Sequence, residues 1–241
     1  MRVVFLGATR GMGRALARKM AERGDSLFVL GHEPEDLERT AADLSVRAAG
    51  AAVGRAHCDL MDPSTFAPAL DAAGGFDCAV VTAGLFATQD AMEQDARLAE
   101  RVLTADFTNT VLFCEEARKR LLAQGGGTLC VFSSVAGERG RKPVALYGAA
   151  KAGLTRYLEA LDHKHRSEGL RVVTVKPGFV KTSMTEGLKP PPFAGEPEQV
   201  AALVLHAIDA GLPVVYAPLP WALVMGVIRR LPRFVMRRVG F

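Results

Sequence analysis

The sequence predicts an α/β fold, a doubly wound parallel sheet of about seven strands with helices on both faces. Two observations carry this prediction. Apolar runs of strand length alternate with helical patterns along nearly the whole chain, and the strand runs are continuously apolar, as in strands covered on both sides. The expected strands are Arg2–Leu6, Leu27–Leu30, Ala52–His57, Asp77–Thr82, Thr128–Ser133, Leu170–Lys176 and Val214–Tyr216. The main expected helices are Gly13–Arg23, Glu35–Ala48, Arg97–Gln124, Ala145–Ser167 and Pro197–Ala210.

Length and charge indicate one globular core with a basic end. The chain has 241 residues, 49% of them hydrophobic and 23% charged, which excludes a largely disordered protein. Its net charge is +4. Residues 171–241 hold nine basic and four acidic groups (+5), so residues 1–170 carry −1. We expect residues 1–218 to form one domain and residues 219–241 to be a basic amphipathic extension of it.

Cysteine and histidine usage indicates neither disulfides nor a metal site. The four cysteines have no metal-ligand spacing and lie in apolar contexts typical of reduced core thiols; they are Cys58, Cys78, Cys114 and Cys130. His163 and His165, two residues apart, point to different sides of a helix. The apolar run Val3–Leu6 is too brief for a signal peptide, and no apolar stretch reaches the ~18 residues of a membrane span. These features predict a cytoplasmic protein without a bound metal.

A glycine-rich turn joins the first strand to the first helix. It reads Gly7-Ala8-Thr9-Arg10-Gly11-Met12-Gly13. Glycines let the backbone approach a pyrophosphate, which then lies against the free N–H groups of the helix N-terminus. The turn therefore predicts a Rossmann-type dinucleotide site at the carboxyl ends of the strands, although a purely structural turn remains an alternative.

The second strand favours NADP(H) over NAD(H). Binders of NAD usually place a carboxylate after this strand, where it accepts from the ribose 2′-hydroxyl. Leu30-Gly31-His32 supplies none, and Arg10 lies in the turn itself. A cation suits a 2′-phosphate, so we assign that role to Arg10, with His32 as a weaker candidate.

Three polar residues predict carbonyl chemistry. Tyr147 and Lys151 are one helical turn apart and share a face, and Ser134 follows the fifth expected strand. A phenol transfers protons poorly at neutral pH unless a neighbouring cation lowers its pKa. Lys151 is placed to do this, while the Ser134 hydroxyl is placed to steady a substrate carbonyl.

Together these motifs resemble the short-chain dehydrogenase/reductase family of the single-domain type, over essentially the whole chain. The resemblance implies that Tyr147 donates the proton, Ser134 stabilises the oxyanion, and Lys151 also binds the nicotinamide ribose. It implies further cofactor contacts from the turn residues Gly7, Thr9, Arg10, Gly11, Met12 and Gly13, and from Asp59, Leu60, Ala83, Gly84, Pro177, Gly178, Val180 and Thr182.

Two positions depart from the family pattern. Thr82 stands where the family usually has asparagine before the alanine and glycine of its fourth-strand motif. Asp106 replaces the helix asparagine that completes the family's catalytic tetrad, and Asn109 is a less suitable substitute. We expect activity to survive in the presence of Asp106, with an altered pH profile, because the side chain adds a negative charge near Lys151.

The basic loops and tail bear on the substrate. Loop cations could attract an anionic group or be solvated surface; they are Arg139, Arg141, Lys142, Lys176 and Lys181. At 100° per residue the last helical pattern separates an apolar arc from arginines, with Pro232 expected to split it. The arc contains Leu223, Val224, Val227, Ile228, Leu231, Phe234 and Val235. With Trp221 nearby, residues 221–241 could contact a membrane, or the arc could pack on the core or a partner subunit.

The substrate itself stays open at this point. Three segments also resemble reductases that make polyprenyl-phosphate-linked arabinose by reducing a decaprenyl-phosphate 2-keto sugar: Val175 to Pro190, Gly137-Glu138-Arg139 and the Arg229–Arg233 tail. We favour an NADP(H)-dependent ketoreductase for a lipid-linked or hydrophobic carbonyl compound. The alternatives are a 3-oxoacyl reductase for carrier-bound chains and a non-catalytic dinucleotide-binding regulator. We expect a homodimer or homotetramer built on the Arg97–Gln124 and Ala145–Ser167 helices, and no nucleic-acid partner.

Overall fold

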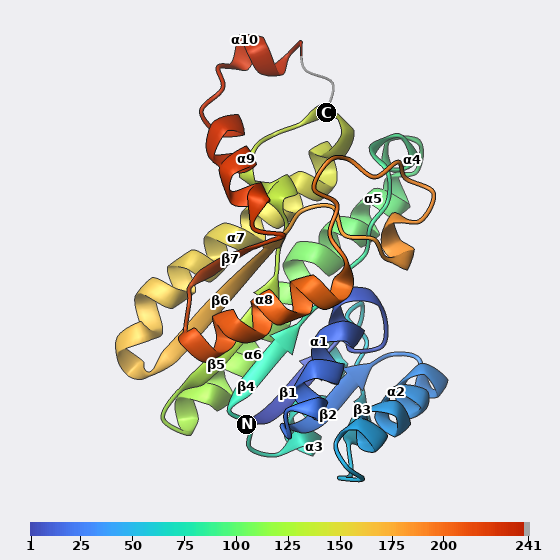
Figure 1. Cartoon of the computed structure of the whole chain (residues 1–241), viewed down its shortest axis with the longest axis vertical. Helices are drawn as coiled ribbons and strands as arrows, with labels where there is room; N and C mark the ends of the chain where they lie inside the picture. Colours follow the sequence, from blue (N-terminus) through green and yellow to red (C-terminus); the bar gives the residue numbers. More distant parts are fainter. Residues whose placement is uncertain (239–241) are drawn as a thin grey trace.

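Seven parallel strands form one twisted sheet in the computed structural model, which describes residues 1–238 (Figure 1). The strand order is β3-β2-β1-β4-β5-β6-β7, so the chain starts in the middle and winds outward twice. This confirms the predicted doubly wound fold. The strands are β1 (Arg2–Leu6), β2 (Ser26–Gly31), β3 (Gly54–His57), β4 (Cys78–Val81), β5 (Gly127–Phe132), β6 (Leu170–Pro177) and β7 (Val214–Ala217).

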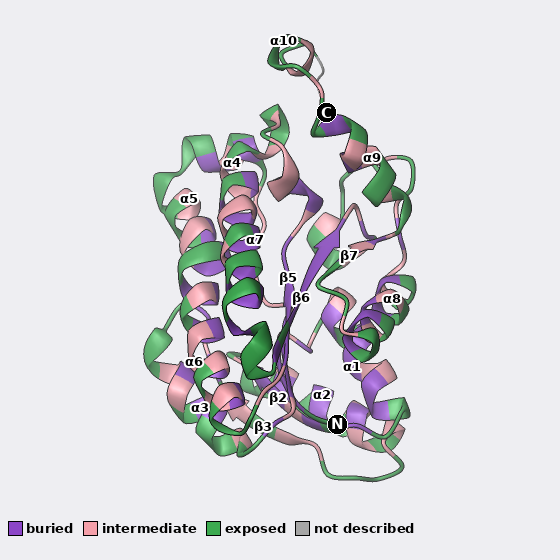
Figure 2. Cartoon of the chain, turned by 90° about the vertical axis from the view of Figure 1, so that its left-hand side faces the viewer, coloured by how far each residue is buried: buried purple, intermediate pink, exposed green. Residues whose placement is uncertain are grey.

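Helices cover both faces of the sheet and enclose two apolar layers (Figure 2). One face packs against α1 (Gly11–Glu22), α2 (Pro34–Arg47) and α8 (Pro197–Ala210). The other face packs against α3 (Phe66–Ala73), α6 (Thr110–Ala123) and α7 (Ala145–His165). Because both faces are covered, each central strand is apolar throughout; β4, for example, has all four residues buried. The four cysteines are unpaired and lie in this core.

The expected helix Arg97–Gln124 is interrupted. The structure divides it into α5 (Ala96–Leu103), a π-helical segment (Thr104–Asn109) and α6. Polar side chains of this segment are buried: Asn109 donates to the Leu60 carbonyl at 2.8 Å, and Thr110 donates to the Ala105 carbonyl at 2.7 Å. Apolar periodicity does not report such a change of helical repeat, which often marks a functional site.

Short elements complete the chain. The helix α4 (Gln89–Gln94) precedes α5, and 3₁₀ turns occupy Pro63–Thr65, Val135–Glu138, Lys142–Val144, Arg166–Glu168 and Ser183–Thr185. Within residues 1–238, no helix combines the length and the apolar character needed to cross a bilayer.

The end of the described chain forms α9 (Pro220–Ile228) and α10 (Arg233–Met236), split at Pro232 as expected. The inner side of α9 is fixed: Met225 and Ile228 pack with Val135 and Tyr216. The expected apolar arc is only partly correct, because Leu223 remains 77% exposed although it was assigned to the same face as Ile228. Residues 239–241 of the expected extension lie outside the described part of the chain.

Candidate active site

The glycine turn between β1 and α1 is held by close backbone contacts. Gly7 has φ +99°, and a Cβ there would lie 2.5 Å from the Ala83 nitrogen. A Cβ on Gly13 would overlap the Gly7 carbonyl and the Thr82 hydroxyl. Thr82 Oγ1 donates to the Gly7 oxygen at 2.8 Å. Thr82, which departs from the family pattern, thus holds the turn in place through its hydrogen bond to Gly7. The contacts around Gly7 and Gly13 leave no room for a side chain at either position.

The N-terminus of α1 has the features of a phosphate site. Arg10 precedes the helix in an extended conformation, and no side chain caps the first turn. The first amides of the helix therefore remain available to an anion above Gly11 and Met12. Thr9 turns its carbonyl away, accepting from Arg14 Nε at 2.8 Å. A diphosphate fits this cradle without displacing any side-chain cap.

A small cationic cluster lies beside the turn. Asp36 accepts from Arg10 at 2.7 Å and from Arg39 at 2.6 Å, and these two guanidinium groups hold the pKa of Asp36 below its usual range. Arg10 and Arg39 remain 69% and 72% exposed. His32, 63% exposed, lies 3.2 Å from Glu33 Oε1. Sequence analysis missed Arg39; its signal was a second arginine one helical turn beyond Asp36.

The expected adenine and ribose residues follow β3 and β4 at the same edge of the sheet. Asp59 Oδ1 accepts from the Met61 N–H at 2.8 Å, and this hydrogen bond holds the turn that contains Leu60. Gly84 runs directly past Asp106, because a Cβ on it would overlap Asp106 Oδ1. Ala83 follows Thr82, next to the glycine turn. Ala83 and Gly84 thus present only backbone and one methyl group beside the glycine turn and Asp106.

The catalytic candidates meet where β5 ends and α7 begins. Ser134 Oγ accepts from the Ala136 N–H at 3.1 Å, which fixes the serine at the start of a 3₁₀ turn. Lys151 Nζ lies 5.7 Å from the centroid of the Tyr147 ring and donates to the Phe132 carbonyl at 3.3 Å. Burial raises the pKa of Tyr147 and the Asp106 charge adds to this; the Lys151 charge and a hydrogen bond with Ser134 only partly offset them, so the net direction in the protein alone is upward. The structure thus brings all three predicted side chains together.

Asp106 forms a buried ion pair with Lys151. Its Oδ1 lies 3.3 Å from Lys151 Nζ and accepts from the Leu85 N–H at 3.1 Å, while both charged side chains are almost completely buried. Oδ2 has no hydrogen-bond partner among residues 1–238. Burial raises the pKa of Asp106 against the opposing effect of Lys151. For Lys151, burial lowers the pKa but Asp106 outweighs it, so the net direction is upward. Asp106 therefore favours the protonated ammonium.

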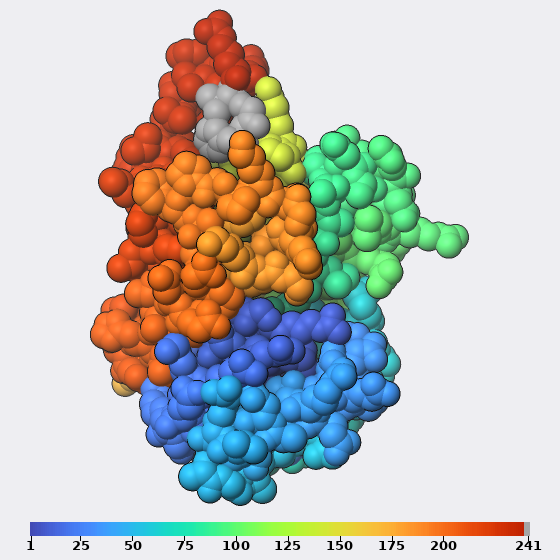
Figure 3. All heavy atoms as spheres, turned by 45° about the vertical axis from the view of Figure 1, so that its right-hand side comes forward, coloured from blue at the N-terminus to red at the C-terminus, as the bar shows by residue number. Residues whose placement is uncertain are grey.

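The segment that follows β6 packs against the glycine turn. A Cβ on Gly11 would lie 3.2 Å from Thr182 Cγ2, so this segment folds back across the glycine turn. In Figure 3 the orange segment lies directly above the blue N-terminal residues. Val180 pairs with Gly195, and Gly178 is packed so closely against Trp221 that a Cβ would overlap the indole. Of the expected nicotinamide-seating residues, Thr182 thus contacts the glycine turn, whereas Pro177 pairs with Ala217 at the end of β6, Gly178 packs on Trp221 and Val180 is buried in the core.

A sequence model described as short chain dehydrogenase matches residues 1–192. The chain belongs to this family. An uncharacterized oxidoreductase of Mycobacterium tuberculosis is 36% identical over 244 residues, covering 98% of this chain and 96% of the relative. Carbonyl reductase family member 4 of Xenopus laevis is 29% identical over 218 residues, covering 85% and 89%. Among solved structures, a Sphingobium yanoikuyae short-chain dehydrogenase in complex with NADPH has a TM-score of 0.83 at 23% identity, covering 96% and 97%.

The membership confirms the predicted family and class of enzyme, an NAD(P)-dependent short-chain dehydrogenase. The glycine cradle and the Ser134, Tyr147 and Lys151 cluster fit a nicotinamide dinucleotide. The narrower resemblance to polyprenyl-phosphate-arabinose reductases stays a prediction, as do the roles assigned to individual site residues.

Most of the basic loop residues of this short-chain dehydrogenase are engaged within the chain. Arg139 donates to the Leu231 carbonyl and Lys142 to the Arg237 carbonyl, both at 2.7 Å. Lys181 pairs with Glu196. Nε of Arg141 is buried without a partner in the part of the chain that the structure describes, and burial lowers the pKa of this guanidinium. Two of the five loop cations, Arg139 and Lys142, therefore attach the tail.

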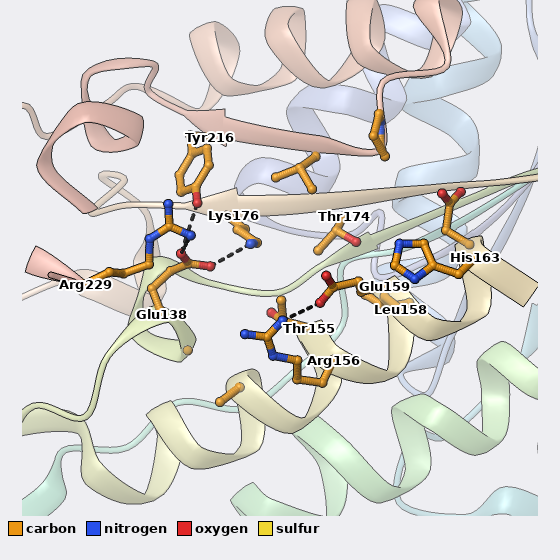
Figure 4. Close-up of a pocket in the computed structure, with 15 residues that line it drawn as sticks. Glu138, Thr155, Arg156, Leu158, Glu159, His163, Thr174, Lys176, Tyr216 and Arg229 are labelled. Carbon is orange, nitrogen blue, oxygen red and sulfur yellow. Dashed lines mark hydrogen bonds and ion pairs between the residues drawn. The ribbon is translucent and has the colours of Figure 1, made fainter. Parts of the chain in front are cut away.

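A polar junction beside a cavity of about 410 Å³ links the tail to the Ser134 loop (Figure 4). Glu138 accepts from Lys176 at 2.6 Å and from the Tyr216 hydroxyl at 3.0 Å, and it lies 3.0 Å from Arg229 of the tail. The carboxylate is almost fully buried, and each partner comes from a different element. Figure 4 shows Lys176 and Tyr216 converging on it from β6 and β7. The candidate catalytic residues Ser134, Tyr147 and Lys151 do not line this cavity.

Proposed function

We propose that the protein is an NADP(H)-dependent oxidoreductase that interconverts a ketone and a secondary alcohol, acting on a lipid-linked or otherwise hydrophobic substrate. The observation that carries this proposal is the grouping of Ser134, Tyr147 and Lys151 at the carboxyl edge of the sheet, beside a glycine cradle that fits a diphosphate. A bound nicotinamide supplies or accepts the hydride. The protein's own side chains manage the proton and the developing charge.

In reduction, the Tyr147 hydroxyl donates its proton to the carbonyl oxygen, and the Ser134 hydroxyl donates a hydrogen bond that stabilises the developing oxyanion. Burial raises the pKa of Tyr147; Lys151 opposes this rise and is the residue that would hold the nicotinamide ribose. Asp106 opposes this effect on Tyr147 and holds Lys151 in its charged form. In oxidation the same groups act in reverse, and the Tyr147 phenolate accepts the proton.

The preference for NADP(H) rests on charge. Arg10 and Arg39 share one carboxylate, Asp36, so the cluster keeps a net positive charge and two exposed guanidinium groups beside the turn. Guanidinium groups bind phosphate oxygens well. His32 adds a third candidate donor at the end of β2. The complex of the Sphingobium yanoikuyae dehydrogenase with NADPH supports the same choice.

The proposal extends to assembly and location. Phe107 and Leu112, on the π-helical segment and α6, are 38% and 44% exposed, which supports a homodimer or homotetramer built on α5, α6 and α7. Peripheral contact of residues 221–238 with a membrane is part of the proposal and is developed below. A cytoplasmic location stays a prediction.

The test is oxidation of NADPH by the purified protein against ketosugars, 3-oxoacyl thioesters and simple dicarbonyls, with NADH in parallel. Turnover with NADPH supports the proposal, and the preferred compound identifies the substrate class. Faster turnover with NADH would overturn the cofactor assignment. Tight NADPH binding with no turnover, in the presence of lipid or detergent, would instead support the regulatory alternative.

A further inference from the structure

One side of α9 is apolar and exposed. Leu219, Leu223 and Val227 are spaced four residues apart and are 58%, 77% and 57% exposed. This spacing aligns them along one face of the helix. The opposite face packs Met225 and Ile228 into the protein, so the exposed row belongs to a helix whose orientation is fixed. Phe234, on α10, is also 61% exposed.

A second exposed apolar group adjoins this row. It lies in the segment between β6 and α8, where Met184, Leu188 and Phe193 are 45%, 38% and 58% exposed. Trp221 Nε1 donates to the Phe193 carbonyl at 3.1 Å and ties the two groups together. The same segment carries Thr182, which lies against the glycine turn. In Figure 3 this orange segment and the red tail lie side by side, so the apolar surface borders the entrance to the active site.

The tail beside this surface carries only positive charge. Residues 210–238 hold no aspartate or glutamate, and all five of their arginines are exposed: Arg229, Arg230, Arg233, Arg237 and Arg238. Among these, Arg229 alone forms an ion pair recorded within residues 1–238, with Glu138. A two-fold symmetric contact through this face would bring the arginines of one copy toward those of the other. A surface of negatively charged lipid headgroups is complementary to both the apolar row and the cations.

We propose that the lipid-docking surface, formed by Leu219, Leu223, Val227 and Phe234 together with Met184, Leu188 and Phe193, lies on an anionic bilayer. The apolar side chains enter the interface while the arginines contact lipid phosphates, each contributing about fivefold to the affinity. This orientation turns the active-site entrance toward the membrane. The substrate class in this inference rests on the proposed function. The docking surface adds a route to that function, because a carbonyl compound anchored in lipid reaches the site without leaving the bilayer.

The test is co-sedimentation of the full chain with vesicles of phosphatidylcholine alone or mixed with phosphatidylglycerol. We expect binding only to the anionic vesicles, weakening as salt rises. Leu223→Gln combined with Val227→Gln should lower the vesicle affinity at least about tenfold. Both positions are exposed, so the variant should fold. The matched control is Val46→Gln, an 81% exposed apolar residue on α2, which should bind as the unmodified chain does.

Absence of sedimentation with anionic vesicles, or equal binding by the double variant, would overturn the proposal. So would a dimer, seen without lipid, that dissociates on the double substitution, since a second copy would then cover the face. Sedimentation needs neither cofactor nor substrate. A protein that binds vesicles but reduces no carbonyl compound would therefore refute the proposed function and leave the docking surface intact.

Discussion

Replacing Asp106 with asparagine removes the negative charge beside Lys151 and nearly preserves the shape of the side chain. In the native chain burial raises the pKa of Tyr147 and the Asp106 charge raises it further, against the lowering effect of Lys151. The substitution should therefore lower the pKa of Tyr147. Reduction requires the protonated phenol, so its rate should begin to fall at a lower pH. Oxidation requires the phenolate, so the pH at which the oxidation rate begins to rise should be lower in the variant than in the native chain.

The structure sets an upper limit to the size of this effect. Lys151 Nζ and Asp106 Oδ1 are 3.3 Å apart, and two unit charges at that distance interact by about 5 kcal/mol at an effective dielectric constant of about 20. This energy belongs to the ion pair; Lys151 offsets the charge of Asp106, so the effect of Asp106 on Tyr147 is smaller. We therefore expect both limbs to move toward lower pH.

The assay is the pH dependence of kcat for reduction and for oxidation, measured in the native chain and in Asp106→Asn. Asp162→Asn is the matched control, because Asp162 is a buried carboxylate on α7 that binds the Val172 N–H and Arg166. It should change stability without moving either limb. Superimposable profiles for the native chain and Asp106→Asn would refute the reasoning about this charge.

Three further predictions concern the cofactor cradle and the tail junction. Arg10→Ala should raise KM for NADPH about tenfold or more and leave KM for NADH unchanged, in steady-state assays. Gly13→Ala should abolish NADPH binding in a fluorescence titration, whereas Gly140→Ala, with open space around it, should not. Glu138→Gln should lower the free energy of unfolding at pH 7 by ~3 kcal/mol, because Lys176 loses its counter-charge. Burial would raise the pKa of Glu138, but Lys176 lowers it below 4.5, so this difference should shrink as the pH falls through that lowered value in denaturant titrations.

Sequence patterns located the sheet well because buried parallel strands are marked along their whole length. All seven expected strands are present, each within two residues of its predicted ends, and Pro197–Ala210 coincides with α8. Short helices such as α3 and α4 were missed because few residues carry their pattern. At the interruption, Thr104–Asn109, Asn109 forms a buried hydrogen bond with Leu60, which is far away in the sequence, and Thr110 bonds the Ala105 carbonyl five residues earlier.

In the candidate site too, some features could be predicted from sequence spacing and others depend on contacts between distant residues. Ser134, Tyr147 and Lys151 could be found from spacing because a helical turn and a strand end fix their relative positions. The ion pair of Asp106 with Lys151 followed from an expected proximity, but its burial and its unpartnered oxygen required coordinates. The junction around Glu138 could not be found, since the partners of this carboxylate come from β6, β7 and the end of α9 and share no sequence pattern.

The central claim is that Tyr147 transfers the proton in a nicotinamide-dependent carbonyl reduction. The most direct measurement is a single-turnover reaction of NADPH with the best carbonyl substrate, comparing the native chain with Tyr147→Phe at equal occupancy by NADPH. The account predicts that the native chain forms the secondary alcohol, and that Tyr147→Phe binds NADPH equally well but reacts about 10²- to 10⁴-fold more slowly. Equal rates in the two proteins would contradict it.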